Sequence, residues 1–120
     1  MKKTFLKDVT ILSIFDFYKD EKIYLGKTIF GICVHDETNR FGIDDRIITS
    51  LIKSQNKLEF ITKSEGNCYV TDNEPEHLEL RLSELVVMRH LLLSPQEVID
   101  ARETLEAREK IEHENAKRLH

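Results

Sequence analysis

The first 72 residues consist of short apolar runs separated by polar turns. From Ile23 to Val34 the side chains alternate, and both alternating sets are largely apolar, which is typical of a central strand covered on both faces. Gly26 and Gly31 within it indicate bends or a close backbone approach. Further strand-like runs lie at 9–18, 47–53, 58–63 and 68–71, with polar connections at 18–22, 37–45, 54–57 and 64–67. The pattern predicts an antiparallel β-meander, either an open curled sheet or a small partial barrel.

The pattern changes near Asn73, where a polar linker containing Pro75 begins. A leucine-rich segment follows the linker. Its first residues, 78–82, match a strand and a helical face equally well, so the sequence leaves both structures open there. A helix is predicted over 84–92, with Ser83 as its N-cap.

A second helix is predicted from Pro95, because Ser94, Pro95 and Glu97 form the pattern of a capping box. Its apolar positions begin with Val98 and Leu105 and then give way to charge. We expect this face to pack on the sheet or on a second subunit over three turns, with a projecting end. The predicted fold is α+β, a β-meander or small partial barrel followed by two C-terminal helices, with a β-rich domain at 1–93 and a charged helix at 94–120.

Charge is uneven along the 120 residues, which are enough for one domain. Residues 73–120 carry 7 basic and 11 acidic side chains, and 7 − 11 accounts for the whole net charge of −4. An acidic chain does not favour binding to nucleic acid, which depends on neutralising phosphates. A nucleic-acid-binding small barrel remains an alternative, and it requires one basic face formed by Lys22, Lys27, Arg40, Arg46, Lys53 and Lys57.

The two cysteines and the N-terminus bear on the compartment. Cys33 and Cys68 lie in apolar runs and are predicted to be buried thiols without a disulfide. The N-terminal apolar run is interrupted by Asp8 and Asp16, and no small-residue cleavage site follows, so we expect no signal peptide. No run has the roughly 20 apolar residues of a membrane span, and we expect a cytoplasmic protein.

Candidate catalytic residues are few. Asp20 and Lys22 match part of a metal-dependent nuclease signature, with Asp8 or Asp16 as a further carboxylate, so a metal-dependent hydrolase is a second alternative. The simpler interpretation is a charged hairpin tip. The histidines have no zinc-site spacing, and the sequence has no phosphate-binding or nucleophile motif. We therefore expect no catalytic residue, metal or cofactor.

Two charged segments are candidate contact surfaces. In "RFGIDDRIITSLI" the apolar half fits a strand, and the polar half fits a loop that exposes Arg40, Asp44, Asp45 and Arg46. The last helix presents Arg102, Glu106, Glu109 and Lys110, which could contact a partner helix or groove.

The same region resembles small bacteriophage and prophage proteins that share an Arg-Phe turn, an Ile-x-Thr-Ser-x-Ile strand, and a Thr-x-Ser-Gly segment that leads to a tyrosine. The corresponding residues here are Arg40, Phe41, Ile47, Thr49, Ser50, Ile52, Thr62, Ser64, Gly66 and Tyr69. The resemblance covers about 30 residues and implies a β-rich module of a mobile-element protein. The function we expect is that of a small intracellular regulatory or accessory protein without enzymatic activity. It would bind a host or phage protein as an inhibitor or immunity-like protein does, with a homodimer through the last helix as another option.

Overall fold

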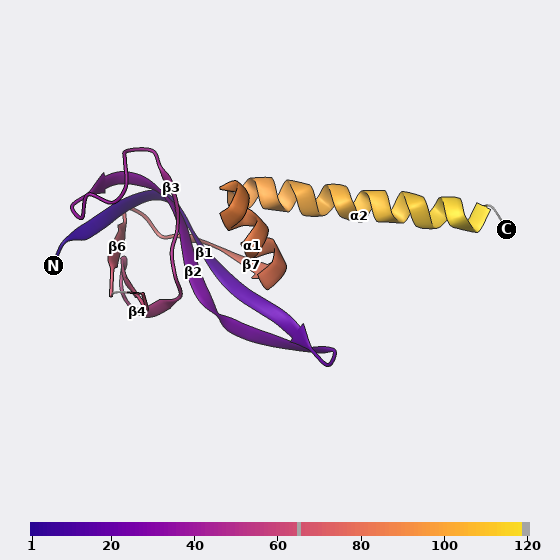
Figure 1. Cartoon of the computed structure of the whole chain (residues 1–120), viewed down its shortest axis with the longest axis horizontal. Coiled ribbons are helices and arrows are strands. Elements are labelled where there is room, and N and C mark those ends of the chain that lie inside the picture. Colours follow the sequence, from indigo (N-terminus) through magenta and orange to yellow (C-terminus); the bar gives the residue numbers. More distant parts are fainter. Residues whose placement is uncertain (65, 119–120) are drawn as a thin grey trace.

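Two long strands organise the fold. The computed structural model describes residues 1–64 and 66–118, with the backbone alone at 114–118. Strands β1 (Lys3–Tyr18) and β2 (Glu21–Asp36) form an antiparallel hairpin that crosses the centre of the molecule (Figure 1). Its turn residues Lys19 and Asp20 both have positive φ, 51° and 65°, as a two-residue type I′ turn requires. The predicted hairpin tip is confirmed.

The remaining strands extend this hairpin on both sides. Strand β3 (Arg46–Ile48) pairs with β2, while β6 (Cys68–Thr71), β5 (Glu59–Thr62) and β4 (Ile52–Asn56) follow β1 in that order. Strand β7 (Glu76–Arg81) pairs with the second half of β1. In the described part of the chain this makes an open, mixed sheet of seven strands. The α+β meander is confirmed, and the parallel pairing of β1 with β6 and β7 is an addition to it.

A β-bulge divides β1 between its two parallel partners. The hairpin register shifts between Lys7 and Thr10, where Asp8 has a φ of 51°. Before the bulge β1 pairs with β6, and from Thr10 onward it pairs with β7. Bulges bend a strand and re-aim its side chains. The bend therefore gives the two halves of β1 different neighbours.

The sheet is buried on both faces, as the sequence predicts for its central strands. Neighbouring residues of one strand belong to different hydrophobic clusters: Ile11 to the first and Leu12 to the second. The same holds in β2 for Ile29 and Phe30. The first cluster contains Leu6, Val9, Ile11, Ile29, Cys33, Ile47, Phe60 and Tyr69. The second contains Leu12, Ile14, Phe30, Leu80, Leu85, Met88 and Val98.

Helix α1 (Leu82–Leu91) follows β7 without a loop and covers the second cluster with Leu85 and Met88. Residues 78–81 are therefore strand, and the helix starts at position 82. The prediction of Ser83 as N-cap is wrong. The cap position is Arg81, whose backbone N–H donates to Glu84 Oε1 at 2.9 Å, and this bond starts the helix two residues earlier.

Helix α2 (Pro95–Arg118) begins with the predicted capping box. The Glu97 N–H donates to Ser94 Oγ at 3.2 Å, and the Ser94 N–H donates to Glu97 Oε1 at 3.2 Å. The helix then runs away from the sheet, so the molecule measures 65 × 31 × 24 Å (Figure 1). The last two residues of the predicted segment 94–120 lie outside the described residues.

The continuous strand predicted over 47–53 is wrong, as is the turn predicted at 54–57. Strand β3 ends at Ile48 because Thr49 replaces the regular pairing: its hydroxyl accepts from Ile29 N at 3.1 Å, and its own N–H donates to Ile29 O at 2.9 Å. Strand β4 starts at Ile52 and continues to Asn56, and the turn follows it at Lys57, which has a φ of 56°.

Candidate functional site

A charged pair joins the two helices. Arg102 of α2 donates from Nε to Glu84 Oε2 at 2.8 Å and from Nη2 to Glu84 Oε1 at 2.9 Å. Partial burial favours a higher pKa for Glu84, but hydrogen bonds from Arg102 and from the Arg81 backbone outweigh it and lower the pKa. This two-point contact fixes the orientation of α2 on α1 more firmly than a single bond would.

An apolar groove of about 370 Å³ lies between the helices beside this pair. Val87 of α1 and Leu105 of α2 line it and remain 49% and 56% exposed. Glu106 and Glu109 add negative charge on the α2 side. The α1–α2 groove, as we define it, is lined by Ser83, Glu84, Val87, Leu93, Val98, Ala101, Arg102, Leu105, Glu106 and Glu109.

The groove brings together three of the four predicted contact residues of α2. Arg102, Glu106 and Glu109 line it, whereas Lys110 is exposed and outside its lining. Packing of the helix over three turns was expected, and for Leu105 this prediction is wrong. Val98 is buried, but α1 has only ten residues, and its first turn lies opposite Arg102, so no helical surface remains to cover Leu105.

Asp36 organises the loop after β2, a role that the sequence pattern did not indicate. Its carboxylate is 8% exposed and accepts from Thr4 Oγ1 at 2.8 Å. It also accepts from the N–H and hydroxyl of Thr38 and from the N–H groups of Arg40 and Phe41. Burial alone would raise the pKa of Asp36, but these hydrogen bonds, first those from Thr38, hold it well below its usual range. The loop therefore depends on an ionised carboxylate.

Three of the predicted loop residues stay together at this end of the sheet. Asp44 donates its N–H to Cys33 O at 2.8 Å, and Asp45 Oδ2 accepts from Gly42 N at 2.8 Å. The Arg40 guanidinium lies 4.8 Å from the centre of the Phe41 ring and 5.9 Å from that of Tyr69. These contacts are structural. Tyr69 of β6 is thereby brought to the loop that carries Arg40 and Phe41.

The fourth loop residue, Arg46, is directed elsewhere. It donates from Nη1 to Leu92 O at 2.9 Å and to Glu97 Oε1 at 2.6 Å. The backbone N–H of Ser94 and the guanidinium of Arg46 both lower the pKa of Glu97. Arg46 therefore links β3 to the connection between α1 and α2. It does not take part in the loop contacts of Arg40, Asp44 and Asp45 described above.

The carboxylates proposed for a metal-dependent hydrolase are dispersed. Asp16 accepts from Phe17 N at 2.8 Å and from Arg81 Nε at 3.2 Å. Asp8 lies in the same strand ten residues before its end at Tyr18, which is roughly 33 Å at 3.3 Å per residue. Asp20 occupies the turn beyond that end. Among the described residues, no group of three His, Cys, Asp or Glu side chains is placed to hold a metal ion.

The basic side chains required for nucleic-acid binding are partly neutralised. Lys22 near the hairpin tip pairs with Glu79 at 2.9 Å, and Arg46 pairs with Glu97. Each pair reduces the positive charge available to a phosphate backbone. Lys22 and Arg46 therefore contribute less positive charge to such a face than the sequence alone indicates.

Both cysteines are buried free thiols, as predicted. Cys33 and Cys68 are 0% and 4% exposed. Burial raises the pKa of each thiol, and for Cys33 the nearby carboxylate of Asp36 raises it further. A protonated, covered thiol is a poor nucleophile.

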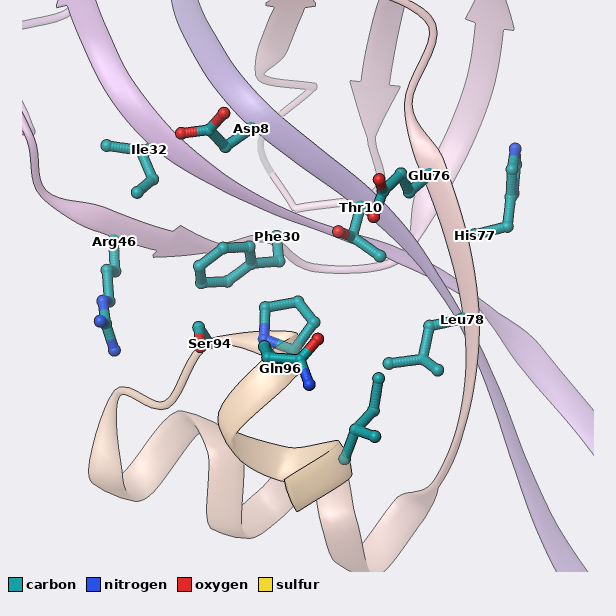
Figure 2. Close-up of a pocket in the computed structure, with 12 residues that line it drawn as sticks. Asp8, Thr10, Phe30, Ile32, Arg46, Glu76, His77, Leu78, Ser94 and Gln96 are labelled. Carbon is teal, nitrogen blue, oxygen red and sulfur yellow. The ribbon is translucent and has the colours of Figure 1, made fainter. Parts of the chain in front are cut away.

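An acidic cleft lies on the other side of the first turn of α2 (Figure 2). It comprises two adjoining cavities of about 290 and 320 Å³ that share Asp8, Thr10 and Glu76. The second cavity adds Asp72 and Glu74. The walls of the first are largely apolar and include Phe30, Ile32, Leu78, Pro95 and Ile99.

Comparisons with known proteins add no assignment. The sequence matches no family model, no curated protein and no solved structure at the significance required. In the described part of the chain, neither α1 nor α2 combines the length and the apolar character that crossing a membrane demands.

Proposed function

We propose that the protein is a small accessory or regulatory protein without enzymatic activity, and that it binds another protein through the α1–α2 groove. The observation that carries this proposal is the exposure of Val87 and Leu105, 49% and 56%, in a groove that two adjacent helices leave open. Clustered exposed apolar side chains next to polar ones are typical of interaction surfaces.

The groove also defines the chemistry of the partner. Its apolar floor suits the apolar face of a helix, and Glu106 and Glu109 suit lysine or arginine side chains beside that face. The proposed setting is the cytoplasm of a bacterial host, and the proposed origin is a phage or prophage, for which the resemblance in residues 40–69 is the support. An inhibitor or immunity-like role fits a binding surface of this kind.

The experiment is affinity capture of the tagged protein from its native host with quantitative mass spectrometry. Leu105→Glu should remove the captured partner, because it places a charge in the apolar groove. Ile43→Glu is the matched control, since Ile43 is 76% exposed but lies in the distant β2–β3 loop. Equal capture by both variants would contradict the proposal.

A second pair of variants separates surface chemistry from catalysis. The double variant Glu106→Lys/Glu109→Lys, which reverses both charges, should lower the affinity for the partner at least tenfold. A triple variant with Asp20, Asp44 and Asp45 changed to Asn should bind it normally. Light scattering of the purified protein tests the homodimer: a dimer that Leu105→Glu dissociates would make a second copy the partner in this groove.

A further inference from the structure

A largely buried threonine, Thr10, presents its hydroxyl to the acidic cleft. Thr10 is 7% exposed, and Figure 2 shows its hydroxyl oxygen directed into the cavity. This hydroxyl forms no hydrogen bond with the described side chains, and its oxygen stays open to the cleft, because Thr28 carries the one fully covered side-chain oxygen without a partner in the described residues. A ligand in the cleft can therefore donate a hydrogen bond to Thr10 Oγ1.

The rim of the cleft has a strong negative charge. Asp8 and Glu76 lie on either side of Thr10 (Figure 2), and Asp72 and Glu74 line the adjoining cavity. None of these four carboxylates takes part in an ion pair among the described side chains. Four uncompensated charges beside a low-dielectric wall attract cations.

The positive charge of the same cleft is compensated by a pairing within the protein. Arg46 lines it but is bound to Glu97 at 2.6 Å. The first turn of α2 also borders it, but the Glu97 N–H is already bonded to Ser94 Oγ. An anion would therefore meet four carboxylates and little positive charge.

The floor distinguishes an organic cation from a metal ion. Phe30, Leu78 and Ile99 present an apolar surface below the carboxylates. A hard cation such as Ca²⁺ needs six to eight oxygen ligands around it. An aliphatic chain that ends in a nitrogen cation matches both parts, because its methylene groups pack on the floor while its N–H groups reach the rim.

We propose that the acidic cleft binds an alkylammonium or alkylguanidinium group, in which the cation lies between Asp8 and Glu76 and donates a hydrogen bond to Thr10 Oγ1. The site is separate from the α1–α2 groove, because Pro95 and Ile99 of α2 line the cleft whereas Val98 and Leu105 line the groove. This inference therefore stands independently of the function proposed above. The group can come from a small polyamine or from a lysine or arginine side chain of a peptide.

The test is an NMR titration of backbone amides at low ionic strength with three probes: spermidine, the blocked peptide acetyl-Lys-Ala-Lys-amide, and CaCl₂. Saturable shifts confined to residues near Thr10, Glu76 and Ile99 are expected with spermidine, with the peptide, or with both. The stronger organic probe identifies the source. Shifts of the same pattern and size with Ca²⁺ would overturn the proposal. So would the absence of saturation with either organic probe at 10 mM, since a dissociation constant of 10 mM corresponds to a binding free energy of only about −2.7 kcal/mol.

Variants complete the test. Asp8→Asn/Glu76→Gln should weaken binding about tenfold or more, and both residues are exposed, so the fold should persist. Thr10→Val, which keeps the shape and removes the hydroxyl, should weaken it several-fold. Glu103→Gln is the control, because Glu103 is an exposed acid of α2 outside the cleft. Equal binding by the double variant and the control would overturn the proposal.

Discussion

Arg102 and Glu84 join α2 to α1 through two parallel hydrogen bonds of 2.8 and 2.9 Å. Replacing Arg102 with Lys keeps the charge but cannot reproduce the planar two-point contact. We expect Arg102→Lys to weaken the attachment of α2 to α1 in part. Arg102→Ala should reduce the free energy that holds α2 on α1 by about 1 kcal/mol, near the upper limit for partly exposed ion pairs. Hydrogen exchange of the α2 amides measures this. Faster exchange throughout the sheet as well would contradict a local role.

The ionised carboxylate of Asp36 should contribute to stability in a pH-dependent way. Its pKa is lowered in the folded protein, so its contribution is complete above the unfolded value of about 3.9 and is lost as the pH falls below it. Asp36→Asn should lower the free energy of unfolding by roughly 2 kcal/mol at pH 7. The variant should also lose less stability than the wild type between pH 5 and pH 2.5. Urea unfolding at several pH values measures both.

The control for Asp36 is Glu21→Gln, which removes an exposed acid beside the hairpin turn. It should leave the pH profile unchanged. A profile for Asp36→Asn that is parallel to that of the wild type would show that the loop does not depend on this charge.

Gly31 lies too close to Leu6 to accept a side chain. A Cβ at this position would be 2.9 Å from Leu6 Cδ1 and 3.0 Å from Leu6 Cβ. We expect Gly31→Ala to destabilise the protein by about 1–3 kcal/mol, because Leu6 is 1% exposed and cannot move aside freely. Gly42→Ala should be nearly neutral, since the nearest atom there is 3.5 Å away. Thermal unfolding of the two variants provides the comparison, and equal melting temperatures would refute the steric argument.

The two thiols should report on unfolding. Because Cys33 and Cys68 are buried and their pKa values are raised, neither should react with a thiol reagent such as DTNB in native protein at pH 8. Both should react at once in 6 M guanidinium chloride. Rapid labelling of one thiol without denaturant would reveal local opening of its strand.

Sequence periodicity predicted the elements that local signals define. The two-face alternation of β2 and the capping box at Ser94 are confirmed, because each depends on neighbouring residues only. The division of β1 between β6 and β7 depends on pairing with residues more than 60 positions away, which periodicity does not encode. The end of β3 depends on one hydroxyl, that of Thr49, which looks like any other strand threonine in the sequence.

The contact surfaces were predicted less completely for a similar reason. Charge on the last helix indicated Arg102, Glu106 and Glu109, but the exposed Leu105 was expected to be covered. Its exposure follows from the length of α1, which no single helix pattern reveals. The acidic cleft assembles Asp8 and Glu76 from distant strands, and only the long-range pairing of β1 with β7 brings them together.

The pairing of β1 also has a consequence for the order of events during synthesis. Strand β1 leaves the ribosome before β6 and β7, so Lys3 remains without its partner Cys68, and Thr10 without Glu76, until those later strands are made. Until then the β1–β2 hairpin exposes an unpaired edge and apolar side chains on both faces, a state prone to aggregation. The nascent chain is therefore expected to need chaperone protection until β7 emerges, and folding should be slow because its decisive contacts are distant in sequence.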